Sequence, residues 1–380
     1  MILIKCNRCG NTDISQFYYG SRGWYCRRCI KFGDVPLPED ESKEVDAEYH
    51  LKFELTERQK EISDKLCEYV NEGKSVLLEA VCGAGKTEIM FEMISQQLKK
   101  GKKVCFAIAR RQVVLEIAER LSKAFSGLKV IPVCQGYTKN TKGDLIVATT
   151  HQLYRYRNYF DVLIVDEPDA FPFKNDEILQ ALAANSCRGN TVYLTATPDS
   201  ELKNRAAEGE LEHLYLSRRP HGHDLCVPQV CYGNRVELLI RGLKWLKRQL
   251  NSTRKVMIFV SSMKKGRMIY QLLRTFVSCC YVSSKTENRD NIINDFRNGR
   301  YQIIVTTLIL ERGITIDNVQ VLVWQRENRV FDEASLTQIS GRVGRSFDNP
   351  EGECLFLCEG RSESVDDCIR SIIRANSYGL

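Results

Sequence analysis

The chain has 380 residues, of which 43% are hydrophobic and 27% are charged, and its formal net charge is +7. No apolar run approaches the roughly 20 residues that a membrane-spanning helix needs, and Met1–Lys5 is too short for the core of a signal peptide. We therefore expect a cytoplasmic protein, with at most peripheral contact at the inner face of the cell membrane. The length suffices for two domains and a small appendage, and the basic charge favours a polyanionic partner without identifying one.

Two cysteine pairs near the N-terminus have the spacing of a structural zinc site. They are Cys6, Cys9, Cys26 and Cys29, with sixteen residues between the pairs. Four thiolates in this C-x₂-C…C-x₂-C pattern hold zinc tetrahedrally and leave no position open for catalysis. Two disulfides are the alternative, but they suit an extracellular chain. Most other cysteines stand singly in apolar runs, where we expect small buried side chains.

Residues 1–35 form the predicted zinc module, and its aromatic residues allow two interpretations. Phe17–Tyr19 and Trp24–Tyr25 are its only apolar cover, so they can pack around the metal that holds so short a segment together. Alternatively, they form a base-stacking surface together with the six Lys and Arg residues of the segment. Residues 36–50 are acidic and contain proline, which predicts a solvated linker.

A glycine-containing loop follows the apolar run Lys74–Ala80 and precedes a helix predicted to begin at Thr87. Its glycines let backbone N–H groups turn toward a phosphate, which also faces the helix N-terminus. Lys86 is expected to reach the β- and γ-phosphates of ATP, and Thr87 to coordinate Mg²⁺. The predicted nucleotide-binding residues of the loop are Ala80, which replaces the usual first glycine, Val81, Cys82, Gly83, Ala84, Gly85, Lys86 and Thr87.

Residues 51–215 alternate short apolar runs with helical stretches, which predicts a doubly wound α/β lobe with a parallel sheet. Within it, Tyr159–Val165 resembles a buried parallel strand and is followed by Asp166 and Glu167. We expect Asp166 to hold Mg²⁺, mostly through water, and Glu167 to orient and polarise the attacking water. The carboxylates alone would fit an acidic turn, but the phosphate loop upstream favours an ATPase.

The alternation breaks around His213–Val230, which predicts a connector over residues 216–232. It then resumes over residues 233–380, which predicts a second α/β lobe without a phosphate loop. A second lobe of this kind needs a function of its own.

That function is indicated by Gln338, Arg342 and Arg345, which stand in one short run. The two arginines are three residues apart, and we expect them on one face of a helix or at its start. Arginines supplied to a nucleotide site in this way act as arginine fingers on the γ-phosphate. Taken alone, the run would predict only a solvated basic helix.

These motifs, taken in order, resemble motifs I, II, III, V and VI of superfamily 2 helicases. The matching segments are Glu79–Thr87, Asp166–Asp169, Leu194–Pro198, Thr306–Thr315 and Gln338–Arg345. The resemblance implies two RecA-like lobes over about residues 53–360, adds Gly313 to the nucleotide site, and makes Gln59 a candidate adenine contact. Thr56 and Gln59 also have the spacing of a helix capping box.

Three further features resemble the ComFA family of late-competence ATPases of Gram-positive bacteria. They are the Asp166–Phe173 run, the Arg219–His223 run and the N-terminal cysteine module. Pro168 departs from the valine usual in that family. The resemblance implies an ATP-driven translocase of single-stranded DNA in competence for transformation. It also implies a membrane DNA-uptake channel and other competence proteins as partners.

The resemblance further implies which residues contact nucleic acid. Arg110 and Arg111 resemble motif Ia, Thr149, Thr150 and His151 the next strand-contacting element, Ser261 motif IV, and Thr306 and Thr307 motif V. Hydroxyl and guanidinium groups hold phosphates rather than read bases, so we expect salt-sensitive, sequence-independent binding. His151 has a packed turn residue as its alternative interpretation.

Other functions stay open on the sequence. A primosomal or repair-type DNA helicase and an RNA-remodelling ATPase use similar motifs, and phosphate contacts do not distinguish DNA from RNA. A non-motor nucleotide switch needs only one lobe, so the arginines of the second lobe argue against it. We predict ATP, Mg²⁺ and Zn²⁺ as cofactors and single-stranded DNA as the principal partner.

Overall fold

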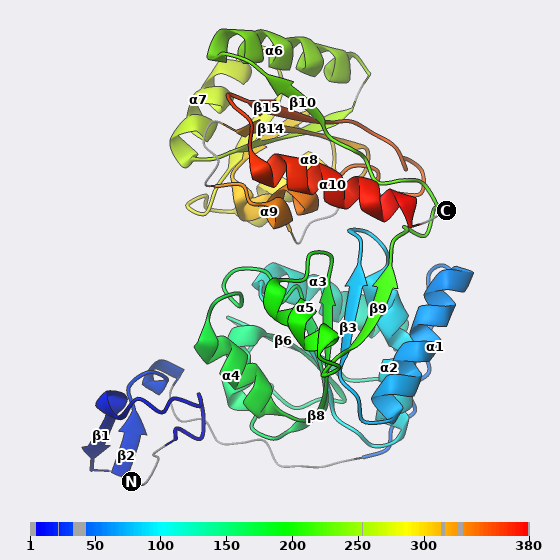
Figure 1. Cartoon of the computed structure of the whole chain (residues 1–380), viewed down its shortest axis with the longest axis vertical. Coiled ribbons are helices and arrows are strands. Elements are labelled where there is room, and N and C mark those ends of the chain that lie inside the picture. The colour runs from blue at the N-terminus through cyan, green and yellow to red at the C-terminus, as the bar shows by residue number, and fades with distance from the viewer. Residues whose placement is uncertain are drawn as a thin grey trace. The chain divides into compact units, whose positions relative to one another are not determined.

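The computed structural model describes residues 5–21, 23–32, 43–252, 254–312, 316–325 and 330–378. The chain divides into two compact units, one comprising Met1–Ala80 and Gly85–Leu216, the other Val81–Ala84 and Ser217–Leu380. Each unit has its own parallel sheet with helices packed on it (Figure 1). The predicted fold class, two parallel α/β lobes with an N-terminal four-cysteine module, is therefore confirmed. Within the described ranges, no helix is both long and apolar enough to cross a membrane.

The N-terminal module of the first unit is built on a small antiparallel hairpin (Figure 1). Its elements are the 3₁₀ helix η1 (Ile14–Gln16), β1 (Phe17–Gly20), β2 (Gly23–Cys26) and the 3₁₀ helix η2 (Ile30–Phe32). Gly10 has a φ of +70°, which glycine adopts readily, and its N–H donates to the carbonyl of Cys6 at 2.9 Å. This tight turn closes the first cysteine pair into a knuckle.

Seven parallel strands form the sheet of the first unit in the order β5-β6-β4-β7-β8-β3-β9. They are β3 (Val76–Ala80), β4 (Val104–Ile108), β5 (Val130–Val133), β6 (Leu145–Thr149), β7 (Phe160–Asp166), β8 (Cys187–Thr195) and β9 (Glu212–Leu216). Strands β4 and β6 are buried at every residue. Their unbroken apolar runs suit this position, because helices cover both faces of such a sheet.

Some helices of the first unit begin at a polar side chain that accepts hydrogen bonds from their first N–H groups. They are α1 (Glu57–Asn71), α2 (Lys86–Lys99), α3 (Arg111–Ala124), the 3₁₀ helix η3 (Thr150–Arg155), α4 (Glu177–Ser186) and α5 (Ser200–Ala207). The capping box predicted for α1 is confirmed: Gln59 N–H donates to the Thr56 hydroxyl, and Thr56 N–H donates to Gln59 Oε1 at 2.9 Å. Asp176 and Asp199 cap α4 and α5.

Six strands form the sheet of the second unit in the order β10-β15-β14-β11-β13-β12. They are β10 (Gln229–Tyr232), β11 (Lys255–Val260), β12 (Cys279–Val282), β13 (Ile303–Thr306), β14 (Val319–Gln325) and β15 (Cys354–Cys358). The helices of this unit are α6 (Arg235–Asn251), α7 (Met263–Leu273), α8 (Arg289–Arg297), the 3₁₀ helix η4 (Leu308–Leu310), α9 (Glu333–Ser340) and α10 (Glu363–Ser377).

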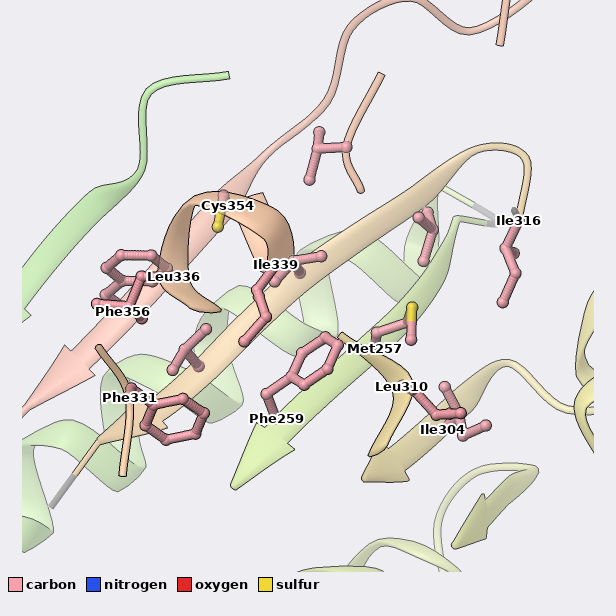
Figure 2. Packing of buried hydrophobic residues seen from close by; sticks show 14 of the residues in the cluster. Met257, Phe259, Ile304, Leu310, Ile316, Phe331, Leu336, Ile339, Cys354 and Phe356 are labelled. Carbon is pink, nitrogen blue, oxygen red and sulfur yellow. The ribbon is translucent and has the colours of Figure 1, made fainter. Parts of the chain in front are cut away.

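Strand β11 at the centre of this sheet divides the apolar core of the second unit between its two faces. Met257 and Phe259 lie in one cluster with Ile339 of α9 (Figure 2). Ile258, whose side chain points the other way, packs in a second cluster with Trp245 of α6. Helix α9, which precedes the predicted arginine fingers, is thus anchored on the central strand.

The C-terminal end of the predicted linker over residues 36–50 packs against the first unit. The carbonyl of the buried Ala47 accepts a hydrogen bond from the Ser95 hydroxyl at 2.7 Å. The ring of Tyr49 packs against Phe91 and Phe125, with centroids 5.8 and 5.5 Å away. These apolar residues attach residues 47–50 to the first unit in spite of their acidic neighbours. The part of the linker before residue 43 lies outside the described residues.

Two strands lie within the segment around His213–Val230, where the sequence pattern breaks. Strand β9 continues the alternation to Leu216 and pairs with β3, and β10 falls inside the predicted connector over 216–232 and pairs with β15. Strand β10 has four residues, none of them buried, and it follows Pro228. A short edge strand of this kind produces no apolar run for sequence analysis to detect.

Candidate functional site

The phosphate-binding loop connects β3 to α2. Gly83 and Gly85 have φ values of +82° and +76°, in the region that favours glycine. Helix α2 begins at Lys86, so the N–H groups of its first turn open at the end of the loop. Lys86 Nζ donates to the carbonyl of Ala80 at 3.3 Å. The loop thus has the backbone turn, the helix N-terminus and the cation that phosphate binding requires.

The predicted metal ligand Asp166 is the last residue of β7, and the water-orienting Glu167 follows it. Glu167 has a φ of +54°, which residues other than glycine rarely adopt, and its N–H donates to the carbonyl of Leu194 at 2.8 Å. Leu194 of β8 pairs with Asp166 on one side and with Leu78 of β3 on the other. Strands β3 and β7 are therefore two strand spacings apart, about 10 Å. The register brings Asp166 to the same edge of the sheet as the loop that leads to Thr87.

Asp169 links the carboxylate segment to the end of β8, a role that the sequence analysis missed. Its side chain is 4% exposed and accepts hydrogen bonds from the Thr195 hydroxyl at 2.6 Å and the Thr197 hydroxyl at 2.7 Å. Thr197 N–H also donates to the Thr195 hydroxyl at 3.0 Å. Both threonines lie in the segment that resembles motif III, and Asp169 lies in the segment that resembles motif II. The carboxylate of one motif and the two hydroxyls of the other are the features from which the sequence could have predicted this contact. Asp169 therefore ties the segment after β7 to the end of β8 by hydrogen bonds.

In the second unit, the predicted motif IV and V residues lie at the ends of neighbouring strands. Ser261 follows β11 and accepts a hydrogen bond from Lys265 Nζ at 3.0 Å. Thr306 ends β13 and is fully buried, with its hydroxyl donating to the carbonyl of Thr307 at 3.1 Å. Because β11 and β13 are parallel neighbours, Ser261 and Thr306 share one edge of the sheet. Gly313 lies outside the described residues.

The two predicted arginine fingers do not lie on a helix or at its start, contrary to expectation. Helix α9 ends at Ser340, so Gln338 lies on it, whereas Arg342 and Arg345 follow it in a turn. Gly344 within that turn has a φ of +67°. The spacing of the arginines was compatible with a helix. The helix nevertheless ends before them, at the Gly-x-x-Gly segment formed by Gly341 and Gly344.

Backbone carbonyls hold both arginines. Arg342 is 2% exposed, and its Nε donates to the carbonyl of Glu311 at 3.1 Å. Arg345 Nε donates to the carbonyl of Gly341 at 2.8 Å. The turn is therefore an ordered structure rather than the solvated basic helix of the alternative interpretation.

Arg219 fastens the same turn from the segment predicted as a connector. It is 3% exposed, and its guanidinium donates to the carbonyls of Gly341 at 2.9 Å, Val343 at 2.6 Å and Gly344 at 2.5 Å. Burial lowers the pKa of Arg219 to about 10, with the positive charge of Arg345 acting in the same direction. Arg219 nevertheless stays charged at neutral pH, so its hydrogen bonds to the turn are charge-assisted.

His221 adds a second contact to this turn. Its Nε2 lies 3.0 Å from the carbonyl of Gly344, and its Nδ1 accepts the N–H of His223 at 3.2 Å. The ring therefore carries its proton on Nε2 and donates to Gly344 in the neutral form. Burial lowers the pKa of His221, opposed by the Gly344 carbonyl and assisted by Arg219.

The four N-terminal cysteines converge in one cluster. Their sulfur atoms all lie within 4.8 Å of one another, with Cys6 and Cys29 at 3.6 Å and Cys9 and Cys26 at 3.8 Å. Tetrahedral zinc with Zn–S bonds of about 2.3 Å requires sulfur separations of about 3.8 Å. Burial raises the pKa of the Cys9 thiol to about 11, which makes its thiolate unfavourable without a cation. A coordinated cation offsets this free-energy cost because it binds the deprotonated form. The cluster therefore fits zinc.

Comparison with known proteins identifies the family. Residues 52–200 match the family described as type III restriction enzyme, res subunit, and residues 235–347 match the helicase conserved C-terminal domain. The chain is 34% identical over 394 residues to competence protein ComFA of Streptococcus pneumoniae, covering 98% of this chain and 90% of that protein. It is 34% identical over 397 residues to competence protein ComFA of Bacillus subtilis, covering 98% and 85%. The chain belongs to the ComFA family.

This ComFA-family chain has the ATPase domains of superfamily 2 helicases and is an enzyme of that class, as its motifs predict. Its fold is similar to that of S. cerevisiae Dbp5 bound to RNA and ADP BeF3. The TM-score is 0.61 at 15% identity, covering 84% of this chain and 91% of Dbp5. At that identity, the likeness supports the fold alone.

The predicted nucleic-acid contacts of the first unit of this ComFA-family chain lie after strands β4 and β6. Arg110 precedes the first turn of α3, and Arg111 Nε donates to the carbonyl of Gln135 at 2.9 Å. Thr149 ends β6, and Thr150 after it is 1% exposed, whereas His151 is exposed. Partial burial lowers the pKa of His151, opposed by Asp176 and assisted by Lys31 of the N-terminal module. Their contacts with nucleic acid stay predictions.

Proposed function

We propose that this ComFA-family enzyme is an ATP-driven translocase that moves single-stranded DNA during DNA uptake in competent cells. The observation that carries the proposal is its 34% identity, over 98% of the chain, to proteins named competence protein ComFA. The superfamily 2 helicase domains supply the ATPase that such movement needs.

Each predicted residue of the nucleotide site has a distinct task in this proposal. Lys86 and the N–H groups at the start of α2 bind the β- and γ-phosphates, and Gln59 contacts adenine. Thr87 and Asp166 hold the Mg²⁺ that neutralises charge on the phosphates. Glu167 orients the attacking water and accepts its proton. The shared sheet edge of Asp166 and the phosphate loop supports this assignment.

The second unit supplies the remaining groups for hydrolysis. Arg342 and Arg345 act as arginine fingers that stabilise charge on the transferred phosphoryl group, and Gln338 helps to sense it. Gly313 belongs to the same nucleotide site. Arg219 acts through these residues as a positioning residue, because it holds the carbonyls of the turn that carries them.

The strand itself is gripped through phosphates. Arg110, Arg111 and the residues Thr149 to His151 provide these contacts in the first unit, and Ser261, Thr306 and Thr307 in the second. A membrane DNA-uptake channel and other competence proteins are the proposed partners, which would place the enzyme at the inner face of the cell membrane. The four N-terminal cysteines hold one structural zinc ion, supported by sulfur separations that fit a tetrahedral site.

The proposal is tested by the ATPase rate of the full chain in the presence of poly-dT, duplex DNA or poly-U. We expect strong stimulation by poly-dT that weakens steeply as salt rises, because each phosphate contact releases counterions. Stimulation by poly-U without stimulation by poly-dT would contradict the DNA assignment and favour an RNA-remodelling ATPase. The Lys86→Ala variant is the matched control for contaminating ATPases.

A further inference from the structure

Four aromatic side chains of the N-terminal hairpin are exposed. The exposed fractions are 72% for Tyr19, 63% for Trp24, 38% for Tyr18 and 37% for Tyr25. Tyr19 pairs with Trp24 and Tyr18 with Tyr25 across the two strands, so each face of the hairpin carries one aromatic pair. The ring centroids are 5.4 Å apart in the first pair and 6.2 Å apart in the second.

These rings do not cover the metal cluster, which corrects one of the two interpretations of the sequence. Phe17 and Phe32 pack on the cysteines, and so does Ile178 of α4. Phe17 and its partner Cys26 lie at the open end of the hairpin, two residues away from Tyr19 and Trp24. The apolar cover of the cysteines therefore comes from Phe17, Phe32 and the first unit, and the Tyr19–Trp24 pair has no such role.

The segment that carries the exposed rings is rich in positive charge. The guanidinium carbon of Arg27 lies 3.4 Å from the centroid of the Tyr18 ring, in cation–π contact. Residues 1–32 contain six Lys and Arg residues against one acidic residue, Asp13. The segment stays positive even when four thiolates and one Zn²⁺ add two negative charges. Exposed aromatic faces within a basic surface are the combination that binds single-stranded nucleic acid, because bases stack on the rings while cations follow the phosphates.

The module is fixed beside an element predicted to contact the DNA strand. Arg28 forms an ion pair of 2.7 Å with Glu177 at the start of α4, and Asn185 at its other end donates to the carbonyl of Arg8 at 2.7 Å. Phe32 packs against Tyr154 of η3 with centroids 5.3 Å apart. Helix η3 contains His151, one of the predicted strand contacts. The module that carries the hairpin thus packs beside a predicted strand contact of the first unit.

We infer that the Tyr19–Trp24 face of the zinc-module hairpin is a binding site for single-stranded DNA, on which one or two bases stack. The inference rests on the proposed function for the identity of the strand. It assigns the module a task of its own: holding the strand outside the ATPase lobes. The metal then acts as a structural support that fixes the hairpin against α4, without touching the DNA.

The test compares two double variants of the full chain, Tyr19→Ala with Trp24→Ala and Tyr19→Phe with Trp24→Phe. Binding is measured by fluorescence anisotropy with a labelled oligothymidylate of about 30 nucleotides, and zinc content is measured for each protein. Each stacked base adds about fivefold or more in affinity. We expect the alanine pair to raise Kd at least about tenfold and the phenylalanine pair, which keeps both ring faces, to bind within about threefold of the unaltered chain. All three proteins should contain equal zinc and show equal ATPase activity without DNA.

DNA-stimulated ATPase activity separates this inference from the proposed function. The alanine pair should raise the oligothymidylate concentration needed for half-maximal stimulation while leaving the maximal rate unchanged, because neither ring belongs to the nucleotide site. Unchanged binding by the alanine pair would overturn the inference and leave the hairpin as a protein-docking surface, while the translocase proposal stands. Equal loss with phenylalanine would also overturn it, because stacking would not be the cause. Failure of the unaltered chain to bind oligothymidylate would overturn both.

Discussion

Removing Arg219 should loosen the turn that carries the predicted arginine fingers. Arg219→Ala deletes the charged donor to four carbonyls, that of Cys82 and the three of the turn, those of Gly341, Val343 and Gly344. Each hydrogen bond from a charged group contributes about 1.5–3 kcal/mol. The variant also avoids the free-energy cost of burying a charged guanidinium. The lowered pKa of Arg219 corresponds to a cost of about 3 kcal/mol, which partly offsets the lost hydrogen bonds. We therefore expect a net loss of about 3 kcal/mol in local stability, which is about 100-fold in the opening equilibrium.

Hydrogen exchange with mass spectrometry measures this opening directly. The N–H groups of Gly341, Arg342 and Val343 donate to carbonyls of α9, so their exchange reports the turn itself. In Arg219→Ala they should exchange about 100-fold faster, and kcat should fall while the KM for ATP changes little. Arg218→Ala is the matched control, because the neighbouring arginine donates to none of the three carbonyls of the turn. Equal exchange in the two variants would refute the positioning role of Arg219.

Four further results are expected. Lys86→Ala should lower ATPase activity at least about 100-fold, measured by phosphate release, and normal activity would remove the phosphate-loop assignment. Asp169→Asn keeps the size of the side chain but weakens two charge-assisted hydrogen bonds from threonine hydroxyls. The kcat of ATP hydrolysis should therefore fall about tenfold while nucleotide binding is retained. An equal loss of kcat and nucleotide binding would point to misfolding. The pKa of His221 is lowered in the folded protein, so the unfolded state takes up the proton first and the turn should lose stability as pH falls below about 6.5, while it is fully stable above that value. Hydrogen exchange of the turn in His221→Gln should lack this pH dependence. An identical pH profile in the variant and the unaltered chain would contradict the prediction. Cys26→Ser should release zinc, measured by atomic absorption, and retained metal would refute the four-cysteine site.

Much of the fold was predictable because its signals are local. The strands and helices around the phosphate loop follow from apolar runs, glycines and caps that are each complete within about ten residues. The carboxylates at the end of β7 were predictable for the same reason, because a buried strand ending in Asp166 is visible in the sequence itself. The edge strand β10 was missed because it pairs with β15 on one side and is partly exposed. A strand in this position does not need an apolar run that the sequence would reveal.

Contacts between distant segments were not predictable. Arg219 is 122 residues from Gly341 along the chain, and no pattern in the sequence pairs them. Asp169 was visible as part of a motif, but its two threonine partners follow only from the register of β7 and β8. The placement of Arg342 after a helix rather than on it depended on a glycine turn that spacing alone does not reveal.

The roles of the aromatic residues in the N-terminal hairpin were not predictable from the sequence either. Its aromatic residues fitted both a metal cover and a stacking surface, and only the strand register separates Phe17, beside the cysteines, from Tyr19 and Trp24. Burial of the metal cluster by Ile178 of α4 could not be predicted, because that residue lies about 150 positions away.

Displacement of streptavidin from a biotinylated oligothymidylate shows whether ATP hydrolysis drives movement along single-stranded DNA. We expect ATP-dependent displacement from one end of the strand by the unaltered chain and none by Glu167→Gln, which should still bind ATP and DNA. Displacement that proceeds equally without ATP, or DNA-stimulated hydrolysis with no displacement from either end, would contradict this expectation.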